Sequence, residues 1–574
     1  MADTYRDDAS ESDSAVLALL GKKQVLKRRF SFVSMFGFAV CELITWETVL
    51  ALFSQSFDNG GPAGAVYGFI IAWSSTLSVY TVISELASMA PIAGGQYYWV
   101  YMLAPDRYKT VFSYVIGWLT SLAWIATVAT ETLFAGTIIQ GIIILDHPDY
   151  VGTPWQGTLL TWAVILGCIL INVVLPSLLP KFEVFILVFH LAGFVAIIAT
   201  LWAMTPEYSP PAEVWATSRN EGGWPTQGLS YCVGFLGNVA TFVGADASVH
   251  LAEEVSNAAK NIPRAILGSM LINGAVGFVT MVTILYCLGD IERVANSATG
   301  YPFIQIFYDS TRSIPGATVM AAVVLSLTWA CAMGITTTAS RMTWSFARDN
   351  GLPASKWLAK VDKRTKVPVI ACLTVTGIAA LLTLIYIGSE TAFNDVISLT
   401  ITGFYGSYFL PASLLLYHRV KGNILPRGTE IAPETSTPDH NSNNETSTRA
   451  PPTEKSSHEK DSPTADTSPD VANGLLLPTA PLIWGPWHLP SLLGTLNNAY
   501  ACVYMLFVIF WSVWPPDAEV TAASMNYSVV VTGGVMILST VWYFVRARKV
   551  YRGPLVDAEV AMQVERRASA VSVG

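Results

Sequence analysis

Charged residues are scarce in this sequence: Asp, Glu, Lys and Arg make up 13% of its 574 residues. A soluble domain carries about 25% charged residues, so the chain has too little charge to cover a water-exposed surface. The net charge of −8 also argues against the basic surface that nucleic-acid binding requires. We therefore expect no nucleic-acid partner and a chain that is mostly surrounded by lipid.

Cysteines and catalytic motifs are equally sparse. The seven cysteines lie singly in or beside apolar stretches, and no two show C-x-x-C spacing, so small buried side chains explain them better than disulfides. The sequence has no G-x-x-x-x-G-K-[ST] phosphate loop and no G-x-S-x-G nucleophile turn. His250-Leu-Ala-Glu-Glu254 resembles half of a zinc motif whose second His is missing. We expect no enzyme activity, no ATP-driven pumping, no cofactor and no bound metal.

Apolar blocks are what the sequence has in abundance, because 52% of its residues are hydrophobic. A helix of about 20 apolar residues crosses the hydrocarbon core of a bilayer. Twelve such blocks lie near 31–53, 65–89, 111–143, 158–176, 182–203, 228–253, 264–288, 316–345, 368–388, 393–418, 491–514 and 525–546. The predicted fold class is an all-α integral membrane protein with about 12 transmembrane helices.

The Lys and Arg residues predict which way this bundle is oriented. With residues 1–30 on the inside, only Arg219, Arg293 and Arg312 of the 33 Lys and Arg residues fall outside. Cytoplasmic loops carry the excess of Lys and Arg in membrane proteins, so both termini are predicted to be cytoplasmic. Residues 1–30 have no apolar stretch before their basic cluster, and we expect the first span to act as an uncleaved insertion signal.

Acidic residues lie inside the apolar blocks, where cations are almost absent. They are Glu42, Glu47, Glu131, Asp246, Glu253 and Glu254. A charge at the bilayer centre costs about 2.5–3.5 kcal/mol, so each should face a cavity, a partner or a substrate. Spans one and six place such acids beside glycine and small residues, which weaken a helix. Broken helices at matching places in two halves of a chain are typical of a transporter binding site.

Structural roles compete with functional ones for several of these residues. If span six is helical, Asp246, His250 and Glu253 share one face, where an acid–His stripe could relay protons or bind a cation. A functional role is favoured for Glu42, Glu47 and Asp246, whereas Glu131 and His250 fit both roles equally. For Glu253 and Glu254, pairing with Lys260 or Arg264 is favoured. Trp46 and Trp329 could form an aromatic wall beside an acid, which would suit an amine.

Ten segments occur in the order found in one transporter family. They are Thr45-Trp-Glu47, Gly60-Gly-Pro-Ala-Gly64, Glu85–Trp99, Asn220–Gly228, Gly244-Ala-Asp246, His250–Glu254, Ile262-Pro-Arg264, Ser340–Asp349, Phe393-Asn-Asp395 and Trp484-Gly-Pro-Trp487. Through them the chain resembles the amino acid–polyamine–organocation superfamily, and within it the fungal amino-acid/choline branch with its choline and GABA permeases. The likeness covers about 30–420 and 481–550.

The resemblance implies an inverted five-plus-five helix repeat with two further helices. On this basis the predicted parts are a cytoplasmic tail (1–30), a ten-helix core (31–418), a cytoplasmic loop (419–490), two last helices (491–546) and a cytoplasmic C-terminal tail (547–574). The stretch 422–480 is rich in Pro, Ser, Thr and acidic residues, and we expect it to be disordered.

The resemblance also implies alternating access, with the substrate held by unwound stretches Ala39–Glu42 and Phe242–Asp246. The predicted substrate-binding residues are Ala39, Val40, Cys41, Glu42, Trp46, Glu47, Phe242, Val243, Gly244, Ala245, Asp246 and Trp329. The predicted coupling residues are Asp246, which aligns with a proton-sensing acid of the wider family, together with His250 and Glu131. The family usually has a Gly/Ser-rich break in span one, but here it reads Ala39-Val-Cys-Glu42, which favours a cationic substrate over a carboxylate.

The expected function is that of a fungal permease importing an amino acid, choline or a related amine, coupled to protons in preference to sodium. The plasma membrane is the expected location, with the vacuole or another internal membrane as the alternative. A second hypothesis of another class is a non-transporting nutrient sensor that signals through its cytoplasmic loop and tails.

Overall fold

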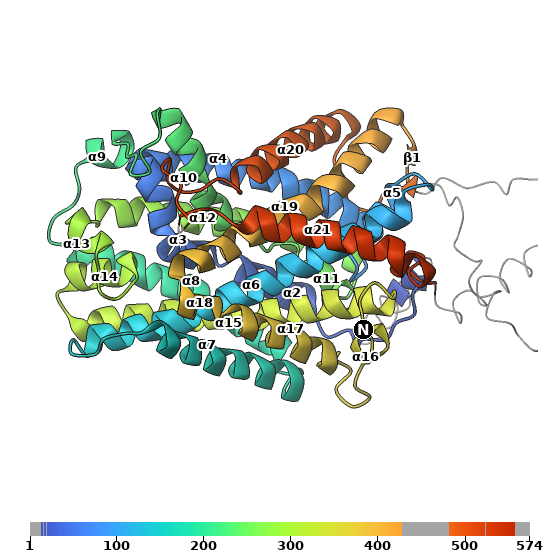
Figure 1. The fold of residues 1–574 in the computed structure, drawn as a ribbon, viewed down its shortest axis with the longest axis horizontal. Helices are drawn as coiled ribbons and strands as arrows, with labels where there is room; N and C mark the ends of the chain where they lie inside the picture. Colours follow the sequence, from blue (N-terminus) through green and yellow to red (C-terminus); the bar gives the residue numbers. More distant parts are fainter. Residues whose placement is uncertain (1–12, 15, 19, 428–481, 523, 557–574) are drawn as a thin grey trace, which may run out of the picture.

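The computed structural model describes residues 13–14, 16–18, 20–427, 482–522 and 524–556, and almost all of its regular structure is helical. Eleven helices among the described residues are long and apolar enough to cross a membrane. The long helices run alongside one another between two ends of the molecule (Figure 1). The all-α membrane fold predicted from the apolar blocks is confirmed.

The membrane-spanning helices follow the predicted order. They are α2 (Phe32–Leu43) with α3 (Thr45–Ala51), α4 (Phe53–Met89), α6 (Lys109–Asp146), α7 (Pro154–Ile169) with η1 (Leu170–Val174), α8 (Leu179–Met204), α10 (Gln227–Ala240) with α11 (Ala247–His250) and η2 (Ala252–Glu254), α12 (Ala258–Tyr286), α15 (Ile314–Arg348), α17 (Val369–Leu382) with α18 (Ile385–Gly388), α19 (Glu390–Lys421), α20 (Ser491–Trp511) and α21 (Ser528–Val545). Shorter helices in the connections are α5 (Gln96–Leu103), α9 (Pro211–Ala216), α13 (Ile291–Ala295), α14 (Pro302–Thr311), α16 (Ser355–Leu358) and η3 (Ala547–Lys549).

The sixth span accounts for the difference between eleven continuous helices and twelve predicted spans. Its helix α10 ends at Ala240, and α11 begins only at Ala247, so residues 241–246 are not helical. Neither piece is long enough to cross a membrane alone. The sequence therefore predicted correctly that span six is interrupted.

The first span is interrupted as well, but not where we predicted. Residues Ala39–Glu42 are helical, because α2 continues to Leu43 without a glycine or proline to end it. The break lies at Ile44, whose φ of 28° and ψ of 46° are outside the helical region. The prediction of an unwound Ala39–Glu42 stretch was wrong, and the interruption is confined to one residue.

The glycine-rich segment after span one is a kink and not a loop. Helix α4 begins at Phe53, well before the predicted 65, and bends at Gly61, where φ is 63°. A Cβ atom at this position would lie 2.6 Å from the backbone nitrogen of Arg219, so only glycine fits. The kink brings the start of α4 against the connection that precedes α10.

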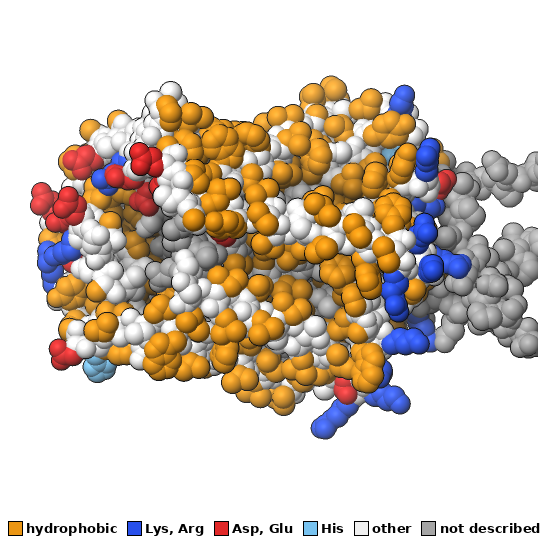
Figure 2. All heavy atoms as spheres, viewed as in Figure 1, with side chains coloured by type: hydrophobic (Ala, Val, Ile, Leu, Met, Phe, Trp, Pro, Cys, Tyr) orange, Lys and Arg blue, Asp and Glu red, His pale blue; other side chains and the backbone are white. Residues whose placement is uncertain are grey.

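The two ends of the bundle differ in charge (Figure 2). Lys and Arg gather at the end that holds α16 and η3, which we call the basic end, and most exposed Asp and Glu lie at the opposite, acidic end with α9 and α13. Between the ends the surface is largely apolar, as expected for contact with lipid.

The loop between α19 and α20 is described only at its two roots. There Ile424–Leu425 (β1) pairs in parallel with Leu482–Ile483 (β2). The first residues of the stretch that we predicted to be disordered therefore include a short strand, and residues 428–480 lie outside the described part of the chain.

Candidate functional site

The breaks in spans one and six lie against each other. Gly244, in the break of span six, has a φ of 116°, and a Cβ atom there would lie 3.0 Å from the backbone oxygen of Glu42. A side chain at position 244 would be strained by this backbone conformation and crowded by Glu42. The glycine therefore allows the unwound stretch of span six to approach the end of α2.

Two side chains from neighbouring helices bind the backbone at these breaks. Asn273 of α12 donates from Nδ2 to the oxygen of Val40 (3.1 Å) and accepts at Oδ1 from the N–H of Thr45 (3.3 Å). At span six the hydroxyl of Tyr80, on α4, contacts the backbone of Phe242, Gly244 and Ala245. Both breaks are thereby supplied with hydrogen-bond partners inside the protein.

Glu42 faces a small cavity beside the two breaks. Its side chain is 2% exposed, and neither carboxylate oxygen has a hydrogen-bond partner among the described residues. The cavity has a volume of about 40 Å³ and is also lined by Glu131, Val243 and Phe134. Oε2 of Glu131 likewise lacks a partner in the described structure. The cavity therefore brings together two acids predicted from the sequence, both short of hydrogen-bond donors.

The Glu42 carboxyl group reaches across to α15. A Cβ atom at Gly334 would lie 3.0 Å from Glu42 Cδ, and closer still to Oε1. The absence of a side chain at position 334 thus makes room for the acid.

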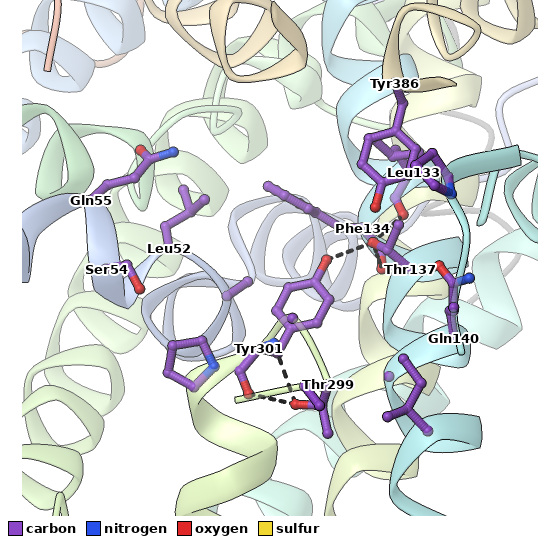
Figure 3. A pocket seen from close by; sticks show the side chains of 18 of the residues that line it. Leu52, Ser54, Gln55, Leu133, Phe134, Thr137, Gln140, Thr299, Tyr301 and Tyr386 are labelled. Carbon is purple, nitrogen blue, oxygen red and sulfur yellow. Dashed lines mark hydrogen bonds between the residues drawn. The ribbon is translucent and has the colours of Figure 1, made fainter. Parts of the chain in front are cut away.

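A larger pocket lies next to this cavity, toward the acidic end (Figure 3). Its volume is about 380 Å³, and the loops 152–154 and 298–302 line it together with α6. Tyr301 points into the space and its hydroxyl lies 2.7 Å from that of Thr137. Leu52, Phe134 and Ile397 line both the pocket and the small cavity, so these three side chains form the partition between them.

Asp246 lies behind the unwound stretch in a buried polar cluster. Oδ2 accepts from Nε2 of Gln96 at 2.7 Å, and Oδ1 accepts from the hydroxyl of Tyr408. Nε2 of His250 lies 3.6 Å from Oδ2. Because Nδ1 of His250 lies 2.8 Å from the oxygen of Ala93, which can only accept, Nδ1 carries a proton. The other ring nitrogen thus faces the Asp246 carboxylate, without a hydrogen bond to it in the described part of the chain.

A second acid–histidine contact joins span one to span five. Nδ1 of His190, on α8, lies 2.8 Å from Oε1 of Glu47, and the Trp46 ring is 5.8 Å from the imidazole. Glu183, which also lies on α8, is fully buried, and both of its carboxylate oxygens lack hydrogen-bond partners in the described part of the chain. Span five therefore contributes titratable groups that the sequence interpretation omitted.

Ion pairs join η2 to α15 at the basic end. Arg341 Nε donates to Glu254 at 2.7 Å, and the guanidinium of Arg348 binds both oxygens of Glu253 at 2.7 and 3.0 Å. The predicted pairing of these two acids is confirmed, but the predicted partners Lys260 and Arg264 were wrong. The chain turns at Asn257, where φ is 51°, and α12 with Lys260 and Arg264 leads away from η2. The two arginines that do face η2 lie seven residues apart on α15.

The segments next to both termini meet the end of α15 at Asp349. The buried ammonium of Lys22 pairs with its Oδ1, which also accepts from the N–H of Leu555 at 3.0 Å. Tyr97 donates its hydroxyl to Oδ2 at 2.8 Å. Burial lowers the pKa of Lys22, and the nearby carboxylate of Asp349 opposes that shift. The N-terminal segment, the C-terminal segment and α15 are thus joined on one side chain.

The remaining predicted residues lie apart from the cavity. Ala39, Val40 and Cys41 are buried in the helical part of α2. Trp46 packs near His190, and Trp329 lies against α7, where its Nε1 would be 3.2 Å from a Cβ atom at Gly167. The aromatic side chain that does line the cavity is Phe134. Among the described residues no group of three or more His, Cys, Asp or Glu could hold a metal ion.

Several site residues were missed for two different reasons. Glu85, Glu183 and His190 are polar residues in apolar spans, so the rule that selected Glu42 could have found them. Tyr80, Gln96, Asn273 and Tyr408 are ordinary residues for a membrane helix, and only the fold shows that they meet the breaks or Asp246.

The sequence was compared with known families and proteins. The family model described as amino acid permease matches residues 30–535. A putative amino acid/polyamine transporter of Macrophomina phaseolina is 31% identical over 68% of this chain and 86% of its own length. The choline transporter of Saccharomyces cerevisiae is 30% identical over 68% of this chain and 69% of its own. The GABA-specific permease of the same yeast is 26% identical over 96% of this chain and 88% of its own.

Among solved structures, a nucleobase-cation-symport-1 family transporter in a closed conformation is similar with a TM-score of 0.46 and 13% identity. The match covers 71% of this chain and 83% of that one.

We predict that Arg341→Met destabilises the protein by about 3–5 kcal/mol, because Glu254 then stays buried without its cation. Thermal unfolding of the detergent-solubilised protein would show a lower midpoint. The double variant Arg341→Met/Glu254→Gln removes the orphaned charge and should recover most of the loss. Arg264→Met changes an exposed arginine and serves as the control. An equal loss in the single and double variants would contradict this account of the pair.

Proposed function

Because the chain belongs to the amino acid permease family, and is therefore an amino acid or amine transporter and not an enzyme, we propose that its solute is a small organic cation. Choline, a polyamine or another amine would enter by alternating access. The observation that carries this proposal is the buried carboxyl group of Glu42, which faces the cavity and has no hydrogen-bond partner among the described residues.

An organic cation supplies what the cavity lacks. A buried carboxylate without a partner is costly, and an ammonium group would neutralise it. Thr127 and Thr130 also line the cavity, and each hydroxyl donates to a carbonyl of its own helix, which leaves the oxygen lone pairs for a cation. Phe134 adds an aromatic face, which favours a quaternary ammonium or amine.

The proposed transport cycle follows from two sets of contacts, the partition beside the cavity and the ion pairs at the basic end. At about 10–15 Å³ for one water molecule, a cavity of about 40 Å³ holds a few waters and no organic solute. The partition of Leu52, Phe134 and Ile397 therefore has to move before the solute enters from the larger pocket. Release toward the basic end requires the ion pairs of Glu253 and Glu254 with α15 to separate.

Proton coupling is proposed to run through Asp246 and His250. The imidazole Nε2 faces the carboxylate at 3.6 Å, and both carboxylate oxygens already accept hydrogen bonds from Gln96 and Tyr408. The two donors, Gln96 and Tyr408, leave little room for a sodium ion at the carboxylate. A proton bound to the imidazole requires no such space. Coupling to protons is therefore proposed in preference to coupling to sodium.

We also propose that the basic end is cytoplasmic, in accord with the excess of Lys and Arg in cytoplasmic loops of membrane proteins. The segments next to both termini contact α15 at this end, so both termini would be cytoplasmic. The proposed organisation keeps the ten-helix core at 31–418, the loop at 419–490 and the last two helices at 491–546, in the plasma membrane.

A nutrient sensor is the second candidate, and one contact favours it. Glu85, at the basic end of α4, binds Arg419 Nη2 at 2.6 Å and the N–H of Leu489 at 2.8 Å. These partners flank the segment 428–481, so a movement of α4 would reach both of its roots.

Radiolabelled uptake in a transport-deficient yeast tests the proposed solute class. We expect choline and polyamines to be taken up and neutral amino acids to compete weakly. Glu42→Gln removes the anion and should raise the KM for the cation by at least about tenfold, a loss of ~1.4 kcal/mol of binding. Glu221→Gln, a change of a 58% exposed acid at the acidic end, is the matched control. Uptake of neutral amino acids alone would refute the proposal, and no uptake of any solute would favour the sensor.

Uptake by Asp246→Asn tests the coupling. The variant keeps the shape of the side chain but cannot take up a proton as a carboxylate does, so we expect accumulation to be lost while the protein reaches the membrane. In the wild type, uptake should rise as the external pH falls and should not depend on sodium. Full, pH-dependent accumulation by the variant would exclude Asp246 as the coupling acid.

A further inference from the structure

The hydroxyl of Tyr80 occupies the break in span six. It donates to the carbonyl oxygen of Phe242 at 3.1 Å. It also accepts from the N–H groups of Gly244, at 3.1 Å, and Ala245, at 3.2 Å. A phenol hydroxyl has one donor and two lone pairs, so these three contacts use its whole capacity. The side chain is 1% exposed, and no solvent competes for the contacts.

The Tyr80 hydroxyl takes the place that a bound anionic group could occupy at a helix break. Backbone N–H groups freed at the break of a membrane helix form a site for an anionic group such as a carboxylate. Here the N–H groups of Gly244 and Ala245 already point at the Tyr80 oxygen. A carboxylate could reach them only by displacing a buried hydroxyl that also holds the carbonyl of Phe242.

The position of Tyr80 is fixed from two sides. Its ring packs edge-on against Tyr408 at 6.0 Å between centroids, and Tyr408 donates to Asp246. Helix α4, which carries Tyr80, also contacts Arg419 and Leu489 through Glu85. The hydroxyl is therefore packed among buried neighbours, and a ligand would have to displace it.

We propose that Tyr80 is a positioning residue that holds the unwound stretch Phe242–Ala245 and, by occupying its free N–H groups, makes the site reject carboxylates at this break. This proposal rests on the proposed function, because it explains how a permease in this family would select an amine without a carboxylate. Glu42 attracts the cation, and Tyr80 removes the place where an accompanying anion would be held.

Hydrogen exchange tests the positioning role without reference to any solute. In the wild type, the peptide that covers residues 242–246 should be protected. Tyr80→Phe removes only the hydroxyl. Exchange at Gly244 and Ala245 should become about tenfold faster, which corresponds to losing a hydrogen bond at the upper end of the usual range of net stabilisation. Tyr405→Phe, which removes another buried hydroxyl, one bound to Thr76, is the control. Rapid exchange of these amides in the wild type would overturn the proposal. This outcome does not depend on whether the variant folds.

Competition by choline and glycine betaine tests the specificity. The two compounds share a quaternary ammonium and differ in bearing a hydroxyl or a carboxylate. In Tyr80→Phe, the ratio of their inhibition constants should shift about tenfold in favour of betaine, as expected when charge-assisted hydrogen bonds become available. An unchanged ratio, with uptake reduced as in Tyr405→Phe, would show a merely structural role. If neither compound competes in the wild type, a quaternary ammonium is excluded as the solute and the selectivity against carboxylates fails in this form, while the exchange experiment decides separately whether Tyr80 holds the break.

Discussion

Backbone hydrogen bonding at the two broken spans is the constraint on which the rest of the site depends. Inside a bilayer no water is present to satisfy a free N–H or carbonyl group, so an interrupted helix needs partners from its neighbours. Asn273 supplies them at span one and Tyr80 at span six. With the backbone held in this way, Gly244 can lie against Glu42, and the acid is placed beside the cavity.

Five of the buried acids fall into two groups that differ in their partners. Glu85, Glu253 and Glu254 each bind an arginine, and they join helices at the basic end. Glu42 and Glu131 face the cavity and lack such cations. In the proposed function, the paired acids hold the helices of the basic end together, and the unpaired acids recognise the solute.

The sequence was sufficient to predict the long helices, but not the break at Ile44, the start of α4 or the contacts between helices. Apolar blocks and the Lys/Arg alternation gave the helices, and glycine beside Asp246 indicated the interruption of span six. The break at Ile44 left no such mark, because a β-branched apolar residue gives no sign of a left-handed conformation. Tyr80, Asn273 and the arginines of α15 act across distances of about a hundred residues or more along the chain, so only the packed bundle shows their roles.

The Glu42 carboxyl group of α2 contacts Gly334 of α15, so the size of residue 334 affects the space available to the acid. Because the carboxyl group fills the space that a Cβ atom at position 334 would take, a larger residue there requires the Glu42 side chain to shift or a shorter residue at position 42. The two positions should therefore change together as related transporters diverge. A side chain at the place of Gly334 would displace the Glu42 carboxyl group from the position in which it faces the cavity, so the size of one residue on α15 decides where the acid of span one lies.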